Sequence, residues 1–284
     1  MKKTRNPVAS GRFYPFKKDL LEEKIESCFN HRLGPGDVPV KNESKGFKAG
    51  MVPHAGYDFS GPCAAHVYKK LFESGIPEVV VVIGTLHTAD FDGIFLDDRD
   101  YRTPLGETKN IFGELDKGKF KVRHDVFDRE HSIEVQLPFL QHFKKDLEFL
   151  PVGVSGIDQE KIVESAEKLY KMVEGFETVF LASSDLSHCG PRYGDKPPKG
   201  VDIRDYMEEK DRKAIKHILE RRPYELIETV EKEGITMCGA QSVALMLQTL
   251  KDFDLKSELL SYYSSNEILD GSDAVGYAGI SFHL

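Results

Sequence analysis

Apolar residues follow two different spacings along this chain, and each spacing predicts one kind of secondary structure. Residues 79–83 are Val-Val-Val-Val-Ile, apolar at every position, as in a strand that is buried on both faces of a sheet. Residues 60–72 carry apolar side chains every three or four positions, which is typical of one face of a helix. Apolar runs predict strands at 47–52, 78–83, 93–96, 147–154, 178–182, 258–263 and 275–282. Helical spacing predicts helices at 16–33, 60–72, 111–115, 132–143, 159–173, 202–221, 223–233 and 239–250.

Strands that alternate with helices in this way predict an α/β fold. We expect three layers, with a mostly parallel or mixed central sheet and helices on both of its faces. Segments 34–46 and 190–200 are rich in Gly and Pro and are predicted to be loops. The chain has 284 residues, near the upper limit for one hydrophobic core. Because no linker or internal repeat divides it, we expect residues 1–284 to form one domain.

Composition and charge narrow the class of protein. Hydrophobic residues make up 40% of the chain and charged residues 30%, which is typical of a globular protein. The net charge of −8 disfavours nucleic acid as a partner. No window reaches the roughly 20 apolar residues of a membrane helix, and the N-terminus leads into no apolar run, so we expect a cytoplasmic protein without membrane contact. The four cysteines show no CxxC spacing, which agrees with reduced thiols.

Polar side chains follow three of the predicted strands at the point where each strand ends. His54 follows the strand at 47–52, His87 follows 78–83, and Asp185 and His188 follow 178–182. The carboxyl ends of parallel strands meet at one edge of a sheet, where ligands bind in open α/β folds. Imidazole is the commonest protein ligand for transition metals. We therefore expect these four side chains to share one site that is capable of binding a metal.

Two further groups carry candidate chemistry. Asp185 and His188 are three residues apart; on a helical turn they would share a face, so both could bind one ion, or the carboxylate could orient the imidazole. Cys238 directly precedes the helix at 239–250, and a helix N-terminus lowers the pKa of a thiol, which makes it a ligand or a nucleophile. His131 and Glu134 lie one helical turn apart, either as part of a helix start or with His131 contacting a substrate.

Seven short segments, found in one order along nearly the whole chain, resemble a known family. They are ASGRFY at 9–14, PHAGY at 53–57, CAAH at 63–66, YRTPL at 101–105, EHSIE at 130–134, SSDLSH at 183–188 and CG at 238–239. Together they resemble the Memo family (mediator of ErbB2-driven cell motility). That resemblance implies a fold like the LigB-type class III extradiol dioxygenases, in which two histidines and a glutamate hold Fe(II) and another histidine acts as acid and base.

The resemblance also implies roles for individual residues. His54 and His87 match the two histidine ligands, His188 matches the acid/base histidine, and Cys238 stands where the glutamate is expected. A thiolate makes the site softer and suits copper, zinc or iron in another role. The implied protein is a metal-binding oxidoreductase of unknown substrate, with Fe(II) or copper favoured and zinc possible. His54, His87 and Cys238 would hold the metal, and Asp185, His188 and His131 would be catalytic.

Two other functions are compatible with the same residues. Animal members of the family are described as phosphotyrosine-peptide binders and as redox-active copper or iron binders, so the cleft could be a module that binds a phosphorylated peptide or small anion. Arg12 and Arg192 would then supply donors to the anion. Alternatively, Cys238 could be the nucleophile of a metal-independent thiol or hydrolytic enzyme, with His188 as its base.

Overall fold

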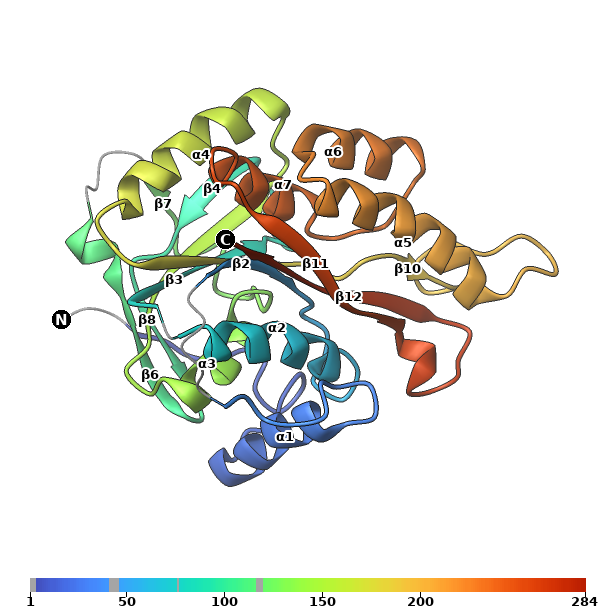
Figure 1. Ribbon diagram of the computed structural model, residues 1–284, viewed down its shortest axis with the longest axis horizontal. Coiled ribbons are helices and arrows are strands. Elements are labelled where there is room, and N and C mark those ends of the chain that lie inside the picture. The colour runs from blue at the N-terminus through green and yellow to red at the C-terminus, as the bar shows by residue number, and fades with distance from the viewer. Residues whose placement is uncertain (1–3, 41–45, 76, 116–119) are drawn as a thin grey trace.

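Four parallel strands form the centre of the sheet in a computed structural model, which describes residues 4–40, 46–75, 77–115 and 120–284 (Figure 1). They run in the order β8 (Glu148–Ser155), β3 (Val79–Thr85), β9 (Thr178–Ser183) and β2 (Phe47–Val52). Val81 in β3 pairs with Leu150 on one side and Phe180 on the other. The apolar run at 79–83 is therefore the buried central strand that its sequence predicts.

The side chains of β3 alternate between two hydrophobic cores, one on each face of the sheet. Val79, Val81 and Ile83 enter one core, and Val80 and Val82 enter the other. Helices α4 (Gln159–Val173), α5 (Ile203–Leu219), α6 (Pro223–Lys232) and α7 (Ala240–Thr249) cover the first core. Helices α1 (Lys18–Asn30), α2 (Gly61–Glu73) and α3 (Leu137–Phe143) cover the second. The predicted α/β fold, with a sheet between two layers of helices, is confirmed (Figure 1).

Antiparallel and short strands extend the sheet at both edges and make it mixed. Beyond β2, β12 (Ala274–His283) runs antiparallel and also pairs with β11 (Lys256–Ser264) and β10 (His188–Cys189). Beyond β8 lie β4 (Gly93–Leu96), β7 (Lys121–Val122), β6 (Gly106–Asn110), β5 (Asp100–Thr103) and β1 (Thr4–Arg5). The sequence pattern does not predict β1, β5, β6, β7 or β10, which are short and largely polar.

Two predicted helices differ from the structure in form. The segment predicted as one helix at 132–143 is a 3₁₀ turn, η2 (Glu134–Gln136), followed by α3. Pro138 stands in the first turn of α3, where its missing N–H costs no hydrogen bond, whereas it would break a longer helix. The short helix predicted at 111–115 is also 3₁₀, η1 (Ile111–Glu114), and a third 3₁₀ turn, η3 (Ser265–Glu267), precedes β12.

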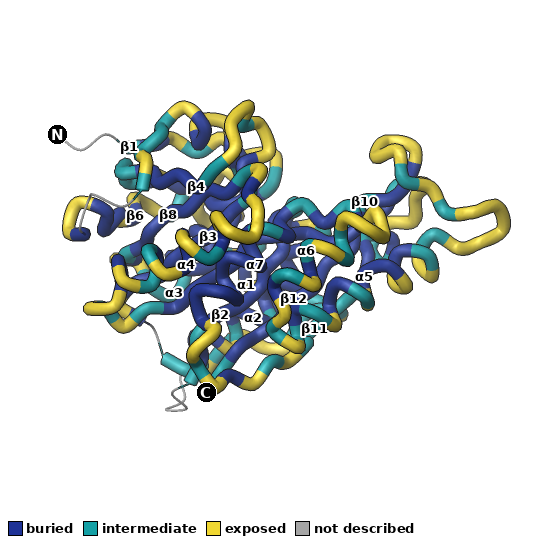
Figure 2. Tube along the Cα trace, turned by 90° about the horizontal axis from the view of Figure 1, so that it is seen from above, coloured by how far each residue is buried: buried dark blue, intermediate teal, exposed yellow. Residues whose placement is uncertain are grey.

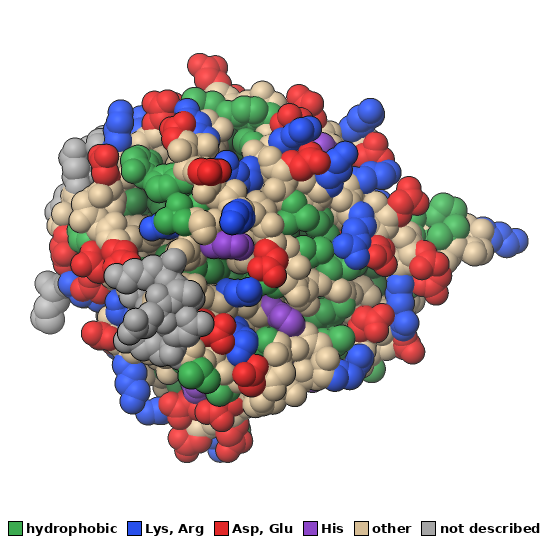
Figure 3. Space-filling model, viewed as in Figure 1, with side chains coloured by type: hydrophobic (Ala, Val, Ile, Leu, Met, Phe, Trp, Pro, Cys, Tyr) green, Lys and Arg blue, Asp and Glu red, His purple; other side chains and the backbone are tan. Residues whose placement is uncertain are grey.

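The outer surface is charged on the face seen in Figure 3, where acidic and basic side chains are interspersed. Figure 2 shows that buried residues follow the strands of the sheet, whereas the loop that joins β10 to α5 projects from the body and is exposed. None of the helices described in the structure is long and apolar enough to cross a membrane. The parallel strands β2, β3 and β9 have their carboxyl ends on the same side of the sheet, and the segments that follow these ends form the site.

Candidate metal centre

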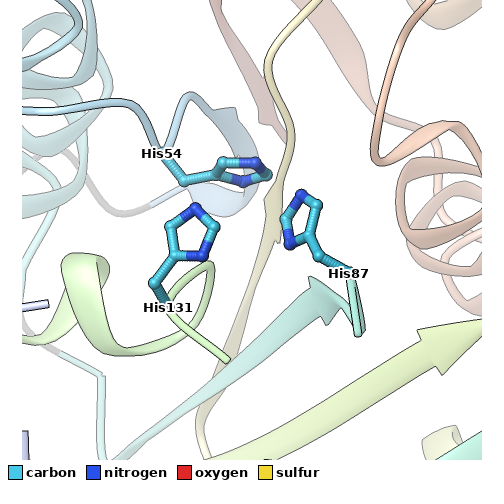
Figure 4. A group of neighbouring side chains, drawn as sticks. All are labelled: His54, His87 and His131. Carbon is cyan, nitrogen blue, oxygen red and sulfur yellow. The ribbon is translucent and has the colours of Figure 1, made fainter. Parts of the chain in front are cut away.

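Three imidazole rings meet beyond the carboxyl ends of the parallel strands (Figure 4). His54 follows β2, His87 follows β3, and His131 lies in the turn before α3. One ring nitrogen from each histidine lies within 4.8 Å of the other two. Metal–nitrogen bonds of about 2.0–2.1 Å place two nitrogens of a tetrahedral site roughly 3.3 Å apart, so small rotations of the rings would bring these atoms onto one ion. His54, His87 and His131 therefore form a group that could hold a metal ion.

Hydrogen bonds around His54 fix which of its ring nitrogens carries the proton. The Ser183 hydroxyl donates its single proton to the Ser132 carbonyl oxygen over 2.7 Å and accepts a hydrogen bond from Gln136 Nε2 at 2.9 Å. His54 Nδ1, 3.0 Å from the same Ser183 oxygen, must therefore donate to it. The lone pair is then on Nε2, which faces the Cys238 sulfur at 3.1 Å. His54 is almost fully buried, with 2% of its surface exposed.

A buried carboxylate performs the same task for His87. Glu130 Oε1 lies 3.1 Å from His87 Nδ1, and the carboxylate also accepts hydrogen bonds from the backbone N–H groups of His87, His131 and Ser132. Burial by itself raises the pKa of Glu130, but the hydrogen bond and charge of His87 lower that pKa to about 2. The carboxylate is therefore ionised and Nδ1 of His87 donates to it, which makes Nε2 the nitrogen that a metal would bind in place of a proton. Carboxylates placed in this way orient metal-binding histidines in many proteins.

The electrostatic surroundings keep two of the three rings neutral near pH 7. Burial and the neighbouring His87 ring lower the pKa of His54 to about 3. Burial and the His54 ring lower the pKa of His131 to about 4, although Glu130 opposes this shift. The pKa of His87 is raised, because its hydrogen bond to Glu130 outweighs the effect of burial. Since a metal binds the neutral form of imidazole, His54 and His131 are already in the ligand form.

The structure brings Cys238 against His54. Its sulfur lies 3.1 Å from His54 Nε2 and accepts a hydrogen bond from the backbone N–H of Asp185 at 3.3 Å. Burial raises the pKa of the Cys238 thiol, and the charge of Asp185 raises it further. The expectation that the following helix lowers this pKa is wrong: α7 begins only at Ala240, and the buried setting outweighs its dipole. Among the described residues, the group of three ligand atoms within 4.8 Å contains His131 rather than Cys238.

Asp185 and His188 lie beside this cluster, Asp185 in the loop after β9 and His188 in β10, and not on a helical turn. The Asp185 carboxylate is buried, accepts a hydrogen bond from the backbone N–H of His54 at 2.8 Å, and approaches His54 Nε2 to 4.0 Å. Burial raises the pKa of Asp185. His188 is in β10, and its Nδ1 donates to the carbonyl oxygens of Leu186 and Thr236, at 2.9 and 3.0 Å. Residues 185–188 therefore do not form the helical turn on which both side chains would share a face, although both residues adjoin the site.

Several residues that support the site could not be identified from the sequence alone. Glu130, Ser183 and Gln136 each bind a site histidine or the group that binds it, and Thr236 pairs with the backbone of His188. Glu130 and Ser183 do lie in two of the segments that resemble the Memo family, which was the one signal available. Arg12 and Arg192, the candidate anion-binding residues, are both exposed.

Comparison with known proteins identifies the family. A family profile described as Memo-like protein matches residues 5–281. The chain belongs to the Memo-like family. A MEMO1 family protein from Methanopyrus kandleri is 39% identical over 290 residues, covering 98% of each chain. Another, from Methanocaldococcus jannaschii, is 36% identical over 294 residues, also covering 98% of each chain. One from Aeropyrum pernix is 32% identical over 293 residues, covering 98% of this chain and 99% of the relative.

The family assignment confirms the resemblance found in the seven sequence segments. The Memo-like match spans the whole site, from the segment before His54 to Cys238. A solved structure of an uncharacterized protein from Escherichia coli K12 aligns with a TM-score of 0.45 and 13% identity, over 83% of this chain and 99% of that one. That similarity is too distant to inform on the site of this Memo-like protein.

Proposed function

We propose that this Memo-like protein binds a transition metal ion and is an oxidoreductase. The observation that carries the proposal is the arrangement of the histidine nitrogens: Ser183 and Glu130 hold the Nδ1 atoms of His54 and His87, so Nε2 of each ring is the atom that would bind an ion. Binding would displace the Cys238 thiol proton from His54 Nε2 and a proton from His87. His131 supplies a third nitrogen within 4.8 Å of the other two. A bound cation requires donor nitrogens placed next to one another in this way, and its binding releases the protons that they carry.

The donor types favour a transition metal over magnesium or calcium. In the proposal, Cys238 becomes a fourth ligand after its thiol loses the proton that faces His54 Nε2 at 3.1 Å. Three imidazoles and a thiolate suit copper, zinc or iron better than magnesium or calcium, which prefer oxygen. We propose iron(II) or copper as the resident ion, with zinc as the competing one. Such an ion would supply one-electron chemistry when bound.

Asp185 and His188 are proposed to hold and move protons beside the metal. His188 keeps its proton on Nδ1, between two carbonyl oxygens, which leaves Nε2 free to take a proton from a substrate. Asp185 is buried with a raised pKa, so it is able to hold a proton at a higher pH than an exposed carboxylate. The substrate is proposed to be a small molecule.

Metal analysis tests the proposal directly. The protein is purified without chelators, loaded anaerobically with Fe(II), Cu(I) or Zn(II), desalted, and analysed for bound metal beside the double variant His54→Ala/His87→Ala. We expect close to one ion per chain for the wild-type protein and almost none for the double variant. Equal, low metal content in both proteins would show that the proposal is wrong.

The other two functions have less support. A thiol nucleophile needs a lowered pKa, whereas burial raises the pKa of Cys238. An anion-binding module would rest on Arg12 and Arg192; the guanidinium of Arg12 lies 6.0 Å from the Phe13 ring, and the backbone N–H of Arg192 binds Asp273. Among the contacts described, neither arginine bonds a site histidine, although the Phe13 ring beside Arg12 packs against His131.

A further inference from the structure

The N-terminal segment crosses to the turn that carries Glu130 and His131. Arg5, at the end of β1, is buried with 3% of its surface exposed. Its guanidinium donates to the carbonyl oxygen of Phe127 at 2.9 Å and to that of Glu130 at 2.5 Å, and it forms an ion pair with Glu134 at 2.7 Å. One rigid side chain thus binds three points along residues 127–134. A planar guanidinium fixes such geometry better than a flexible ammonium group.

Glu134 closes the same connection from the other side. Its carboxylate is completely buried and accepts hydrogen bonds from the backbone N–H groups of Val8 and Ala9, both at 2.8 Å. The hydroxyl of Tyr14 donates to it at 2.6 Å. With Arg5, these contacts attach both ends of residues 4–14, hereafter the N-terminal arm, to one carboxylate next to the site.

The N-terminal arm also touches a site histidine directly. The Phe13 ring packs against the His131 ring, with centroids 4.4 Å apart. The Phe13 carbonyl oxygen accepts a hydrogen bond from the backbone N–H of Tyr57, in the segment that follows His54. The arm therefore contacts three parts of the turn that carries His131: its backbone carbonyl oxygens, the Glu134 carboxylate and the His131 ring.

We propose that Arg5 is a positioning residue of the metal centre and that the N-terminal arm sets its metal affinity. This inference rests on the proposed function. Arg5 holds the carbonyl oxygen of Glu130, while the carboxylate of the same residue orients His87 through Nδ1. A shift of this turn displaces the carboxylate from His87 and moves His131 at the same time. Two of the three histidine donors thus depend on one arginine that touches neither ring.

The physical alternative is that Arg5 serves folding alone. Arg5→Lys separates the two explanations, because it keeps the charge opposite Glu134 but removes the planar fork that reaches two carbonyl oxygens. Gln141→Ala is the control. Gln141 is buried, accepts a hydrogen bond from Thr103, and donates to the Gly106 carbonyl oxygen, away from the turn at 127–134. Its loss lowers stability without touching Glu130 or His131.

The experiment is a titration of the full-length, metal-free protein with Co(II), followed by its visible absorption, with the thermal midpoint measured for each variant. We expect Arg5→Lys to weaken Co(II) binding by about 10–100-fold, as for groups that orient metal ligands, and to alter the absorption spectrum. Gln141→Ala should lower the thermal midpoint, but its Co(II) affinity and its absorption spectrum should equal those of the wild-type protein. Tyr14→Phe removes only one donor to Glu134, so it should fold and show a smaller, few-fold loss of affinity.

The outcomes separate this inference from the proposed function. A wild-type protein that binds no Co(II) overturns the proposed function and the inference with it. Wild-type binding that Arg5→Lys and Tyr14→Phe leave unchanged overturns the inference alone. Equal losses of affinity in Gln141→Ala and Arg5→Lys would also overturn it, because the effect would then follow stability and not the position of the turn.

Discussion

Two clusters among the residues that the structure describes bring three possible metal ligands within 4.8 Å of one another, but they differ in what those ligands already bind. In the second cluster, of Asp97, Asp98 and His124, Arg99 donates to both carboxylate oxygens of buried Asp97, at 2.9 and 2.6 Å. His124 Nε2 lies 2.6 Å from the Asp98 carboxylate. The Arg99 guanidinium thus neutralises the Asp97 carboxylate and occupies the oxygens that a metal would bind.

In the histidine cluster, protein groups fix the Nδ1 atoms of two rings, and the partner of His54 Nε2 is the Cys238 sulfur at 3.1 Å, itself a possible metal ligand. Ser183 and Glu130 fix the Nδ1 atoms of His54 and His87, and no cationic side chain bonded there corresponds to Arg99 among the contacts described for these rings. Proximity of ligand atoms is therefore not sufficient for a metal site. The comparison indicates that donor atoms held in position by an outer ring of hydrogen bonds, without a cationic side chain bound to them, distinguish a candidate centre from an ion pair.

The largest expected effect comes from removing one donor from each cluster. His54→Ala should reduce metal affinity by more than about 100-fold, since it deletes a ligand instead of a group that orients one. His124→Ala should leave the affinity unchanged. Isothermal titration with Zn(II) measures both. Similar losses in the two variants would mean that the difference between the clusters has been misread.

Removing the carboxylate of each cluster should separate affinity from stability. Glu130→Gln keeps the size of the side chain but loses the charge that orients His87, so affinity should fall about 10–100-fold. Asp97→Asn removes one of the two carboxylates that bind the Arg99 guanidinium and leaves Asp128, 2.7 Å from it, so it should cost about 1.5–3 kcal/mol of stability, as for a lost hydrogen bond to a charged group, with no change in affinity. Chemical denaturation and metal titration of both variants check this pair of results.

Cys238→Ser tests whether sulfur contributes to the histidine cluster. Three imidazoles remain, so Zn(II) should still bind, but the loss of a soft ligand should weaken Cu(I) binding by about tenfold or more relative to Zn(II). Competition titrations with chromophoric chelators measure the ratio of the two affinities. An unchanged ratio would place Cys238 outside the ligand set.

The smallest expected effect is a pH dependence in the metal-free protein. The folded-state pKa of His54 is lowered from 6.5 to about 3, so the unfolded chain binds more protons than the folded one between these values. This contribution to stability is present above pH 6.5 and is lost as the pH falls toward 3; His131, with a pKa of about 4, acts in the same direction. Thermal midpoints from pH 7 to 5 should therefore decline less steeply in His54→Asn/His131→Asn than in wild type or His124→Asn. Parallel declines in all three proteins would contradict the expectation.

The sequence predicts the scaffold of the site well because burial leaves a clear pattern. The apolar runs that form β2, β3 and β9 show where each strand ends, and parallel pairing then brings His54, His87 and Asp185 to one edge of the sheet. Short polar strands leave no such pattern. Strand β6, with the sequence GETKN, has no apolar side chain and is held by its neighbours.

The details of the site depend on contacts between residues far apart in sequence, which patterns do not encode. His131 lies beside His54 and His87 because the turn before α3 packs beside the strand ends. Arg5 binds Glu134, which is 129 positions away along the chain. The pKa of Cys238 was mispredicted for a related reason. The sequence shows that a helix follows the thiol, but not that the thiol is buried against Asp185.

The hydrogen bonds around Ser183 have a consequence for how fast the proton on His54 Nδ1 exchanges with solvent. Gln136 donates to Ser183, and Ser183 donates to Ser132, so the series runs in one direction and the proton on His54 Nδ1 has no alternative acceptor. All of these groups are buried. An imidazole N–H enclosed in this way should exchange slowly with water and give a sharp downfield proton resonance. That signal would report on the histidine cluster in the intact protein, without a label and before any ligand is added.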